Sequence, residues 1–421
     1  MDRLCLHAAN MARAIVAFAV AALVAVPAAA GNSVTDWNVR AQHAIADVAQ
    51  QLPWNQTRSF AMVSGAVYDA VNAIDGMPYR PYLVAPAARR SYSKDAAVAT
   101  AAHDVLVGIL PAQRSALDQQ YDEALGAIPD GPRKAGGVAV GARAADAMLA
   151  ARMNDGVDAS QTWIVGTQPG RWRPTPPFMI GISAQIGFMR TFAIPDADLF
   201  RSPPPNALTS ARYAADFNEV KSIGAASSTT RTSDQTEAAL FWGGQQNPWW
   251  SIFDQIALAR HLSVSQTARM LALVNISSHD SFIANFKAKH HWSSWRPITA
   301  IPEAGADGNP DTAPESDWTP LLPTPPVPEH PSGHAMASAT ITTILTLFFR
   351  TDRMAFTGYS RDTNTTRHYA RFSDALKEIV NSRVWGGIHF RTADDQGAVE
   401  GAKLATYVWL TRLQPTRRSH P

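Results

Sequence analysis

Seven residues in the last third of the chain have the types and spacing of a site for a tetrahedral oxyanion. Lys289 and Arg296 form a basic pair, and Arg383 lies six residues before His389. Three positive side chains hold a dianion through charge-assisted, partly bidentate hydrogen bonds. The tripeptide Ser332-Gly333-His334 lies between the two pairs. Its neutral donors would bind further oxygens, and the two histidines complete a displacement site, one bonded to the central atom and one donating a proton.

The tripeptide lies where a proline-rich loop meets the apolar segment Ala335–Phe349, so it is expected at the N-terminus of a helix. A helix N-terminus offers unpaired N–H groups and a positive dipole end to an anion. Ser332 is a natural cap and Gly333 allows close approach. His334, next to this cradle, is a candidate proton donor.

Lys289 ends a mostly apolar stripe of a predicted helix that opens with the capping box Ser263–Gln266. A lysine buried alone there would be costly, so we expect it to meet an anion or to reach water. The following loop, Ile298 to His330, is long and has no helical or strand periodicity. A loop of this length without regular structure is usually retained because it forms part of a functional site.

The rest of the chain divides into two helical halves. Apolar residues recur at three-to-four spacing through an Ala-rich N-terminal half, residues 31–155, and again through residues 213–421. Residues 156–212 form a connection rich in proline and aromatic residues, which we interpret as the seam between the halves. In the second half we expect a helix over Phe372–Trp385, a break at two glycines, and a last helix from about Ala393.

Composition narrows the possible partners. With 421 residues, 46% of them apolar, and a formal charge of +2, the chain can bury a large core and has no basic run for nucleic acid. Residues 1–30 resemble a signal peptide cleaved after Ala30, with an uncleaved anchor helix as the alternative. The one cysteine, Cys5, lies inside it. We therefore expect a secreted or periplasmic protein without disulfides or stable membrane insertion, compatible with a homodimer.

A divalent-metal site is an alternative use of the histidines. His330 and His334 have i,i+4 spacing, and His279, His290 and His291 are near in sequence. Pro331, however, puts His330 outside the helix, and the neighbouring cations would repel a metal cation. We therefore favour the oxyanion.

The three motifs together resemble a known superfamily. Lys289-x6-Arg296-Pro297, then Pro331-Ser-Gly-His334, then Ser382-Arg383-x5-His389 is similar to the signature of the vanadium-dependent haloperoxidases and type-2 phosphatidic acid phosphatases. The sequences Trp295–Ala300, Trp318–Pro323 and Trp385–Phe390 look like the secreted bacterial haloperoxidase-like branch.

The resemblance implies an all-α fold of helical bundles around a single oxyanion site. It would make His389 the ligand of vanadium in a haloperoxidase, or the nucleophile that forms a phosphohistidine in a phosphatase. His334 would be the acid–base residue. In the peroxidase, vanadate would keep its oxidation state and act as a Lewis acid toward peroxide, which Lys289 would polarise for attack by halide. The implied oxyanion ligands are Lys289, Arg296, Ser332, Gly333 and Arg383.

Two positions depart from the family pattern. An aspartate is usual four residues after the final histidine, and this chain has Ala393 there, with Asp394 and Asp395 just beyond. If that aspartate orients the imidazole, then Asp394 reaches it from a shifted turn or a backbone carbonyl replaces it. Five residues before the motif serine, where an aromatic residue or histidine is frequent, stands Val327.

Three functions agree with these motifs. The first is a vanadate-dependent peroxidase that oxidises halide with hydrogen peroxide. The second is a soluble, secreted acid phosphatase that needs no cofactor and acts on a phosphate ester. The third is a non-catalytic oxyanion-binding protein. The long loop and its flanking sequences favour the first, and the absence of predicted membrane helices argues against an integral lipid phosphatase.

Overall fold

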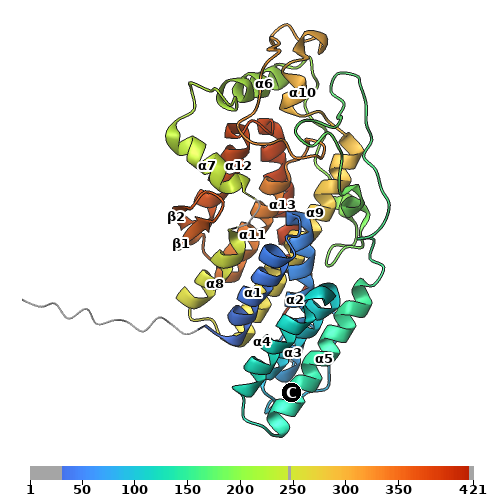
Figure 1. Cartoon of the computed structure of the whole chain (residues 1–421), viewed down its shortest axis with the longest axis vertical. Helices are drawn as coiled ribbons and strands as arrows, with labels where there is room; N and C mark the ends of the chain where they lie inside the picture. The colour runs from blue at the N-terminus through green and yellow to red at the C-terminus, as the bar shows by residue number, and fades with distance from the viewer. Residues whose placement is uncertain (1–30, 245–247, 417–421) are drawn as a thin grey trace, which may run out of the picture.

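The computed structural model describes residues 31–244 and 248–416 (Figure 1). The predicted signal peptide, with Cys5, lies outside the described residues. Helices dominate the described part, which confirms the prediction of an all-α fold. The helices are α1 (Ser33–Gln42), α2 (Pro53–Ile74), α3 (Lys94–Ile109), α4 (Arg114–Gly126), α5 (Pro132–Arg152), α6 (Ala211–Ile223), α7 (Ser233–Gly243), α8 (Trp249–Ala259), α9 (Val264–Trp292), α10 (Pro297–Ala300), α11 (Gly333–Phe349), α12 (Phe372–Trp385) and α13 (Arg391–Thr411).

Shorter elements lie between these helices. A π-helical turn, η1 (His43–Val48), follows α1, and the 3₁₀ turns are η2 (Pro111–Gln113), η3 (Ala184–Phe188), η4 (Ala197–Phe200) and η5 (Ala304–Ala306). Phe372–Trp385 is helical as predicted, whereas the last helix begins at Arg391, two residues earlier than expected.

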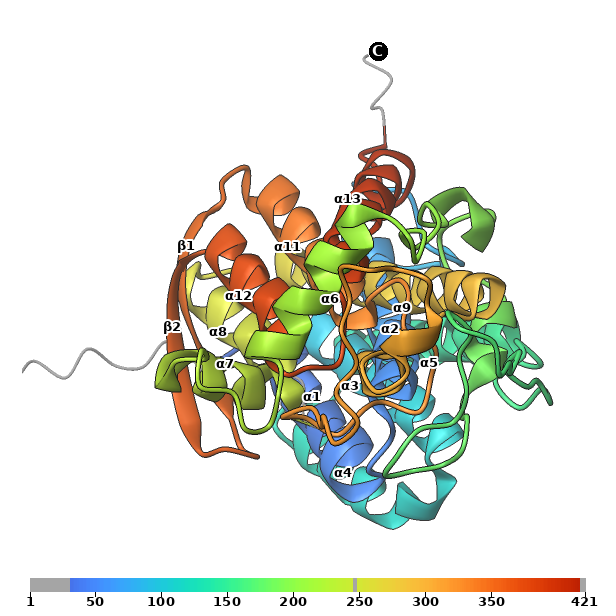
Figure 2. The same cartoon turned by 90° about the horizontal axis from the view of Figure 1, so that it is seen from above.

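The long helices α2, α9, α11 and α13 run through the middle of the molecule, with α3, α4 and α5 at one end and α6, α10 and α12 at the other (Figure 1). One continuous apolar core extends from Val34 to Leu413 and so joins both halves of the chain. A smaller core lies under α6 and the long loop, which cross one end of the molecule (Figure 2).

Glycines on α13 allow this helix to pack very closely against α11. A Cβ on Gly401 would lie 2.1 Å from the Met336 carbonyl, and one on Gly397 would lie 2.6 Å from the Ser332 carbonyl. Neither contact is tolerated, so only glycine lets α13 approach the first turn of α11. This close packing of α13 fixes the position of the α11 N-terminus, where the oxyanion is predicted to bind.

The segment between α11 and α12 is a β-hairpin, which the sequence analysis did not predict. Strand β1 (Arg353–Ser360) pairs antiparallel with β2 (Thr365–Arg371), and burial alternates along β1. The rings of Phe356 and Tyr369 face each other across the strands at a centroid distance of 5.2 Å. Alternating burial of this kind is the period-two pattern of a strand with one buried face.

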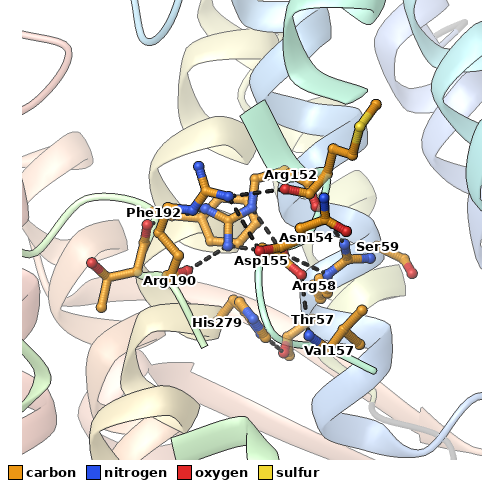
Figure 3. Close-up of polar contacts among 12 residues, drawn as sticks. Thr57, Arg58, Ser59, Arg152, Asn154, Asp155, Val157, Arg190, Phe192 and His279 are labelled. Atoms are coloured by element: carbon orange, nitrogen blue, oxygen red, sulfur yellow. Dashed lines mark hydrogen bonds and ion pairs between the residues drawn. The ribbon is translucent and has the colours of Figure 1, made fainter. Parts of the chain in front are cut away.

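A buried polar cluster, the polar anchor, holds the start of the 156–212 connection (Figure 3). It consists of Arg58 on α2, Arg152 at the end of α5, and Asp155. The carboxylate of Asp155 accepts hydrogen bonds from Arg58 Nε at 2.9 Å and from Arg152 Nε at 3.0 Å. The Arg152 guanidinium also donates to the Thr191 carbonyl at 3.1 Å and lies 3.8 Å from the ring centroid of Phe192.

Asp280, in the middle of α9, fixes the same connection further along. Its carboxylate accepts from the backbone N–H groups of Phe192, Ala193 and Ile194 at 2.6 to 2.8 Å. Burial raises the pKa of Asp280 to about 6, against the lowering effect of these three donors. A connection of low periodicity is thereby tied to the central helix by charged groups rather than by regular secondary structure.

Within the described residues, no single helix has both the length and the apolarity to cross a membrane; the bent pair Lys94–Ile109 and Pro111–Gly126 passes on length and composition alone.

Candidate active site

The three predicted motifs converge on one cavity of about 250 Å³. It lies where the C-terminal end of α9, the N-terminus of α11, the end of α12 and the turn before α13 meet. The predicted residues that line it are Lys289, Arg296, Gly333, His334, Arg383 and His389. Ser332 is fully buried directly beside them and caps α11, with its hydroxyl 3.5 Å from the Ala335 N–H.

Lys289 is buried and neither reaches water nor contacts a carboxylate. Its Nζ donates to the carbonyls of Pro328 and Glu329, each at 2.7 Å. Burial lowers the pKa of Lys289 well below its ordinary value, and the charge of Arg296 lowers it further. The proline-rich loop thus supplies backbone oxygens to Lys289, and the expectation that this side chain meets an anion stays a prediction, since Lys289 lines the cavity where the oxyanion is expected.

Arg296 connects the same loop to the final histidine. Its Nε donates to the Val327 carbonyl at 3.0 Å, and its Nη1 donates to the Ile388 carbonyl at 2.6 Å. The same Nη1 lies 3.1 Å from Nε2 of His389. Burial lowers the Arg296 pKa to about 10, so the side chain stays charged at neutral pH.

Arg383 has fewer partners. Its Nη1 donates to the Trp242 carbonyl at 3.1 Å, while its buried Nε has no hydrogen-bond partner among the described residues. Burial lowers the Arg383 pKa to about 10, opposed by the nearby Asp394. A buried guanidinium N–H without a partner is uncommon in a folded protein.

The contacts of His389 define its tautomer. A guanidinium can only donate, so Nε2 of the ring must be the acceptor toward Arg296. The proton therefore lies on Nδ1, which donates to Glu329 Oε1 at 2.9 Å. Burial, followed by the charges of Arg296 and Lys289, lowers the pKa of His389 well below its ordinary value, so the ring is neutral.

Glu329 is the site residue that the sequence analysis missed. Its Oε1 accepts from both His389 Nδ1 and, at 3.0 Å, the Phe390 N–H. Burial raises its pKa to about 7 against the lowering effects of Arg296 and Lys289. The signal in the sequence was a lone acidic residue in a proline-rich loop, three positions before Ser332.

Neither aspartate after the final histidine takes the role considered for Asp394. Asp394 lies in the first turn of α13 and is fully buried beside Ser332 and Arg383, which both lower its pKa against a larger rise caused by burial. Asp395 is exposed on the next position of the helix. The imidazole is oriented from the opposite side, by Glu329, so the substitution of Ala393 leaves His389 with a carboxylate partner.

The remaining histidines have separate environments. His334 is partly buried and its side chain lines the cavity, where burial and the charge of Arg383 lower its pKa. His330 points away, and its Nε2 lies 3.1 Å from the Ser202 hydroxyl and 2.9 Å from the Pro203 carbonyl. In the described part of the chain no three His, Cys, Asp or Glu side chains converge as a metal cation would require. Val327 adds an apolar wall to the cavity.

Comparison with known proteins gives the class to which this fold and site belong. Residues 269–417 match the family model of the VCPO second helical-bundle domain. The structure also superimposes on two bacterial vanadium haloperoxidases over nearly their whole length. One is a vanadium-dependent iodoperoxidase, with a TM-score of 0.76, 24% identity, and 92% of this chain and 97% of that chain covered. The other is a holo-type vanadium-dependent chloroperoxidase, with a TM-score of 0.72, 18% identity, and 91% and 98% covered.

Among curated proteins, the chain is similar to the vanadium chloroperoxidase of Curvularia inaequalis. The two are 25% identical over 169 residues, which is 32% of this chain and 27% of that protein. The match thus spans about a quarter of the curated relative. Residues 269–417 are thus similar to the second helical-bundle domain of this family, and the chain as a whole has the fold of the bacterial vanadium haloperoxidases.

Proposed function

We propose that the protein is a vanadate-dependent haloperoxidase-like enzyme that oxidises halide with hydrogen peroxide. One observation carries the proposal: three buried basic side chains, those of Lys289, Arg296 and Arg383, line one cavity with the neutral His389, and within the described residues none of the three forms an ion pair with a carboxylate. Such a site attracts a dianion and offers it a nitrogen ligand. The names of the similar proteins support vanadate over phosphate as that dianion.

The residues present fit vanadate. The Nε of Arg383 is a buried donor without a partner among the described residues, Arg296 contributes a positive charge, and Lys289 an ammonium whose charge a bound anion would stabilise. In the proposed site, Lys289, Arg296 and Arg383 would hold the oxyanion together with Ser332 and the Gly333 N–H, and His389 would be the ligand of vanadium. When bound, vanadate would supply Lewis-acid activation of peroxide without changing its oxidation state.

The chain's own residues would perform the remaining tasks. Glu329 keeps the His389 proton on Nδ1, so that Nε2 carries the lone pair, which Arg296 contacts in the protein without a ligand. His334, kept neutral by its surroundings, is placed to take a proton from entering hydrogen peroxide and return it to the leaving oxygen. Lys289 would polarise the O–O bond for attack by halide. The overall balance is halide, hydrogen peroxide and one proton giving hypohalous acid and water.

The test compares purified protein with and without added vanadate. We expect vanadate-dependent halogenation of a phenolic dye in the presence of bromide or iodide and peroxide, and its loss in His389→Ala. The same preparations are assayed for phosphate release from an aryl phosphate. Phosphate release that vanadate inhibits, without halogenation, would replace the proposal with the acid phosphatase. Vanadate binding without either reaction would indicate a non-catalytic oxyanion-binding protein.

A further inference from the structure

A second cavity, which we call the Arg269 cavity, lies far from the oxyanion site and has a volume of about 380 Å³. Arg269 lines it near the start of α9, whereas Lys289 lines the oxyanion cavity near the end of the same helix. The two residues are 20 positions apart, which is roughly 30 Å along an α-helix. The Arg269 cavity is therefore a separate site, with further walls from α2, the end of α11 and the end of α13.

Arg269 is surrounded by aromatic rings on the wall of this cavity. The residue is only 8% exposed, and its Cζ lies over the rings of Tyr79, Trp409 and Phe348, at 4.2, 5.1 and 5.7 Å from the centroids. All three rings line the same cavity. Contacts of this kind stabilise a guanidinium charge and hold its plane in one orientation. The positive charge is thus fixed in place in the protein without a ligand.

The hydrogen-bond donors of Arg269 are mostly unused. Its Nε donates to the Leu413 carbonyl at 3.3 Å. Among the described residues, the terminal nitrogens of this side chain donate no hydrogen bond, and no carboxylate forms an ion pair with it. A buried guanidinium in this state is uncommon and costly. The rings offer a π face to the charge, but they lack the in-plane oxygens that a guanidinium binds.

The other charged residues on the cavity wall leave it positive. Arg350 lines the cavity and is exposed, and its side chain contacts no carboxylate among the described residues. Asp75 is the one acidic residue among the described residues that line the cavity, and its carboxylate forms an ion pair with Lys94. The Lys94 ammonium also donates to the Ser265 hydroxyl at 3.0 Å. The cavity therefore attracts an anion.

The shape and polarity of the walls favour an organic anion over an inorganic one. Beside the three rings, Tyr68 and Pro415 add apolar surface, which is unfavourable for a strongly hydrated ion. A carboxylate is planar, and its two oxygens match the parallel N–H bonds of a guanidinium. We propose that the Arg269 cavity binds a small organic carboxylate, held by bidentate hydrogen bonds from Arg269 and attracted by Arg350 at the rim. This inference goes beyond the proposed function and does not depend on it.

The experiment titrates benzoate into the purified full-length protein, with and without saturating vanadate, and follows binding by calorimetry. We expect benzoate to bind with the same affinity in both preparations, because the two cavities lie at opposite ends of α9. Absence of binding at millimolar benzoate would overturn the inference. Complete displacement of benzoate by vanadate would place it in the oxyanion cavity and would overturn the inference as well.

Two variants test the cavity itself. Arg269→Gln removes the charge and the paired donors, so benzoate affinity should fall at least about tenfold. Arg350→Gln changes an exposed side chain and should lower the affinity about two- to fivefold, which keeps the test decisive if Arg269→Gln does not fold. Benzoate affinity that Arg350→Gln leaves at the wild-type value, with Arg269→Gln either unchanged or unfolded, would overturn the inference.

Arg260→Gln is the matched control. Arg260 also lies over an aromatic ring, that of Phe349 at 5.9 Å, but it is exposed and does not line the cavity. Its benzoate affinity should therefore equal that of the wild type. An equal loss of affinity in Arg260→Gln and in the cavity variants would show a general effect of charge and would overturn the assignment.

Inorganic phosphate tests the class of anion. Phosphate carries charge but has neither a planar pair of oxygens nor an apolar part for the rings. In the vanadate-treated protein we expect phosphate to displace benzoate only when it is present in at least about tenfold excess. Displacement by phosphate at equal concentration would overturn the assignment of a carboxylate ligand.

Discussion

The polar anchor around Asp155 and the oxyanion site are both buried clusters of basic side chains, but their hydrogen bonding differs. In the polar anchor, both guanidinium groups contact one carboxylate, and donors that remain reach backbone carbonyls. In the oxyanion site, the carboxylate of Glu329 bonds to His389 instead of to a cation, and that of Asp394 lies near Arg383 with no ion pair between the two among the described residues. The polar anchor is complete without a ligand, whereas the oxyanion site keeps positive charge and a donor available.

The comparison shows how a basic cluster that stabilises the fold can be distinguished from one that can bind a ligand. Composition does not distinguish them, since each contains two arginines. The difference lies in where the donors go and whether one is left without a partner. This gives four predictions, arranged from the largest expected effect to the smallest.

Removing the central carboxylate of the polar anchor should have the largest effect on stability. Asp155→Ala leaves two arginines without their anion in a buried place, which we expect to lower the free energy of unfolding by about 3 to 5 kcal/mol. Urea denaturation measures this. Asp130→Ala is the matched control, because the Asp130–Lys134 pair is exposed at its acidic end and should contribute less than about 1 kcal/mol. Equal losses of stability in Asp155→Ala and Asp130→Ala would contradict the structural role assigned to the polar anchor.

Removing a cation from the oxyanion site should weaken oxyanion binding and leave the stability of the fold nearly unchanged. Arg383→Met deletes a buried charge that has no carboxylate partner, so the free energy of unfolding should change by less than about 1 kcal/mol. Oxyanion affinity should fall about 10- to 100-fold, the value of a charge-assisted hydrogen bond. Vanadate and phosphate titrations measure the affinity. Arg152→Met, which removes a cation of the polar anchor, should destabilise the protein and leave oxyanion affinity unchanged.

Replacing Glu329 should weaken vanadate binding by about tenfold, because partners of a ligating histidine set its orientation and basicity. In Glu329→Gln the amide oxygen still accepts from Nδ1 but carries no charge. Vanadate affinity and the ¹⁵N chemical shifts of His389 report the affinity and the tautomer separately. In Asp394→Asn the shifts should stay at their wild-type values. A shift of the tautomer in Asp394→Asn alone would contradict the assignment of Glu329.

The last prediction is a pH dependence of stability arising at Asp280. Its pKa is about 6 in the folded protein and about 3.9 in an unfolded chain. Between these values the folded state binds more protons, so this group makes stability fall as pH rises from about 4 to 6. Asp280→Asn should be less stable but should show a shallower slope in urea denaturation between those pH values. An unchanged slope would assign the dependence to other carboxyls.

The sequence predicted those features that depend on local pattern. Helical periodicity located the helices, and the capping box at Ser263 begins α9 as expected, with its reciprocal hydrogen bonds present. Motif spacing predicted seven site residues, and the structure brings six of them to one cavity with Ser332 beside it; the resemblance relates positions whose convergence no local rule gives. The hairpin at 353–371 was missed because its alternation runs through polar residues such as Arg353 and Thr357, which hide the period of two.

Glu329 was missed for a different reason. Its partner His389 lies sixty positions away in the chain, and the contact depends on how the proline-rich loop folds over the end of α9. A sequence pattern describes neighbours along a helix or strand, and this pair belongs to neither. The departure at Ala393 was the indirect clue, because it removed the expected partner of the imidazole and required another.

The backbone carbonyls of the proline-rich loop bear on ion selectivity. The oxygens of Val327, Pro328 and Glu329 surround Arg296 and Lys289 as a first hydration shell would. Carbonyl dipoles solvate a cation without cancelling its net charge, as a carboxylate would. The loop therefore lowers the cost of burying these side chains without cancelling their positive charge, so a segment without regular structure would favour an anion over a cation in the proposed site.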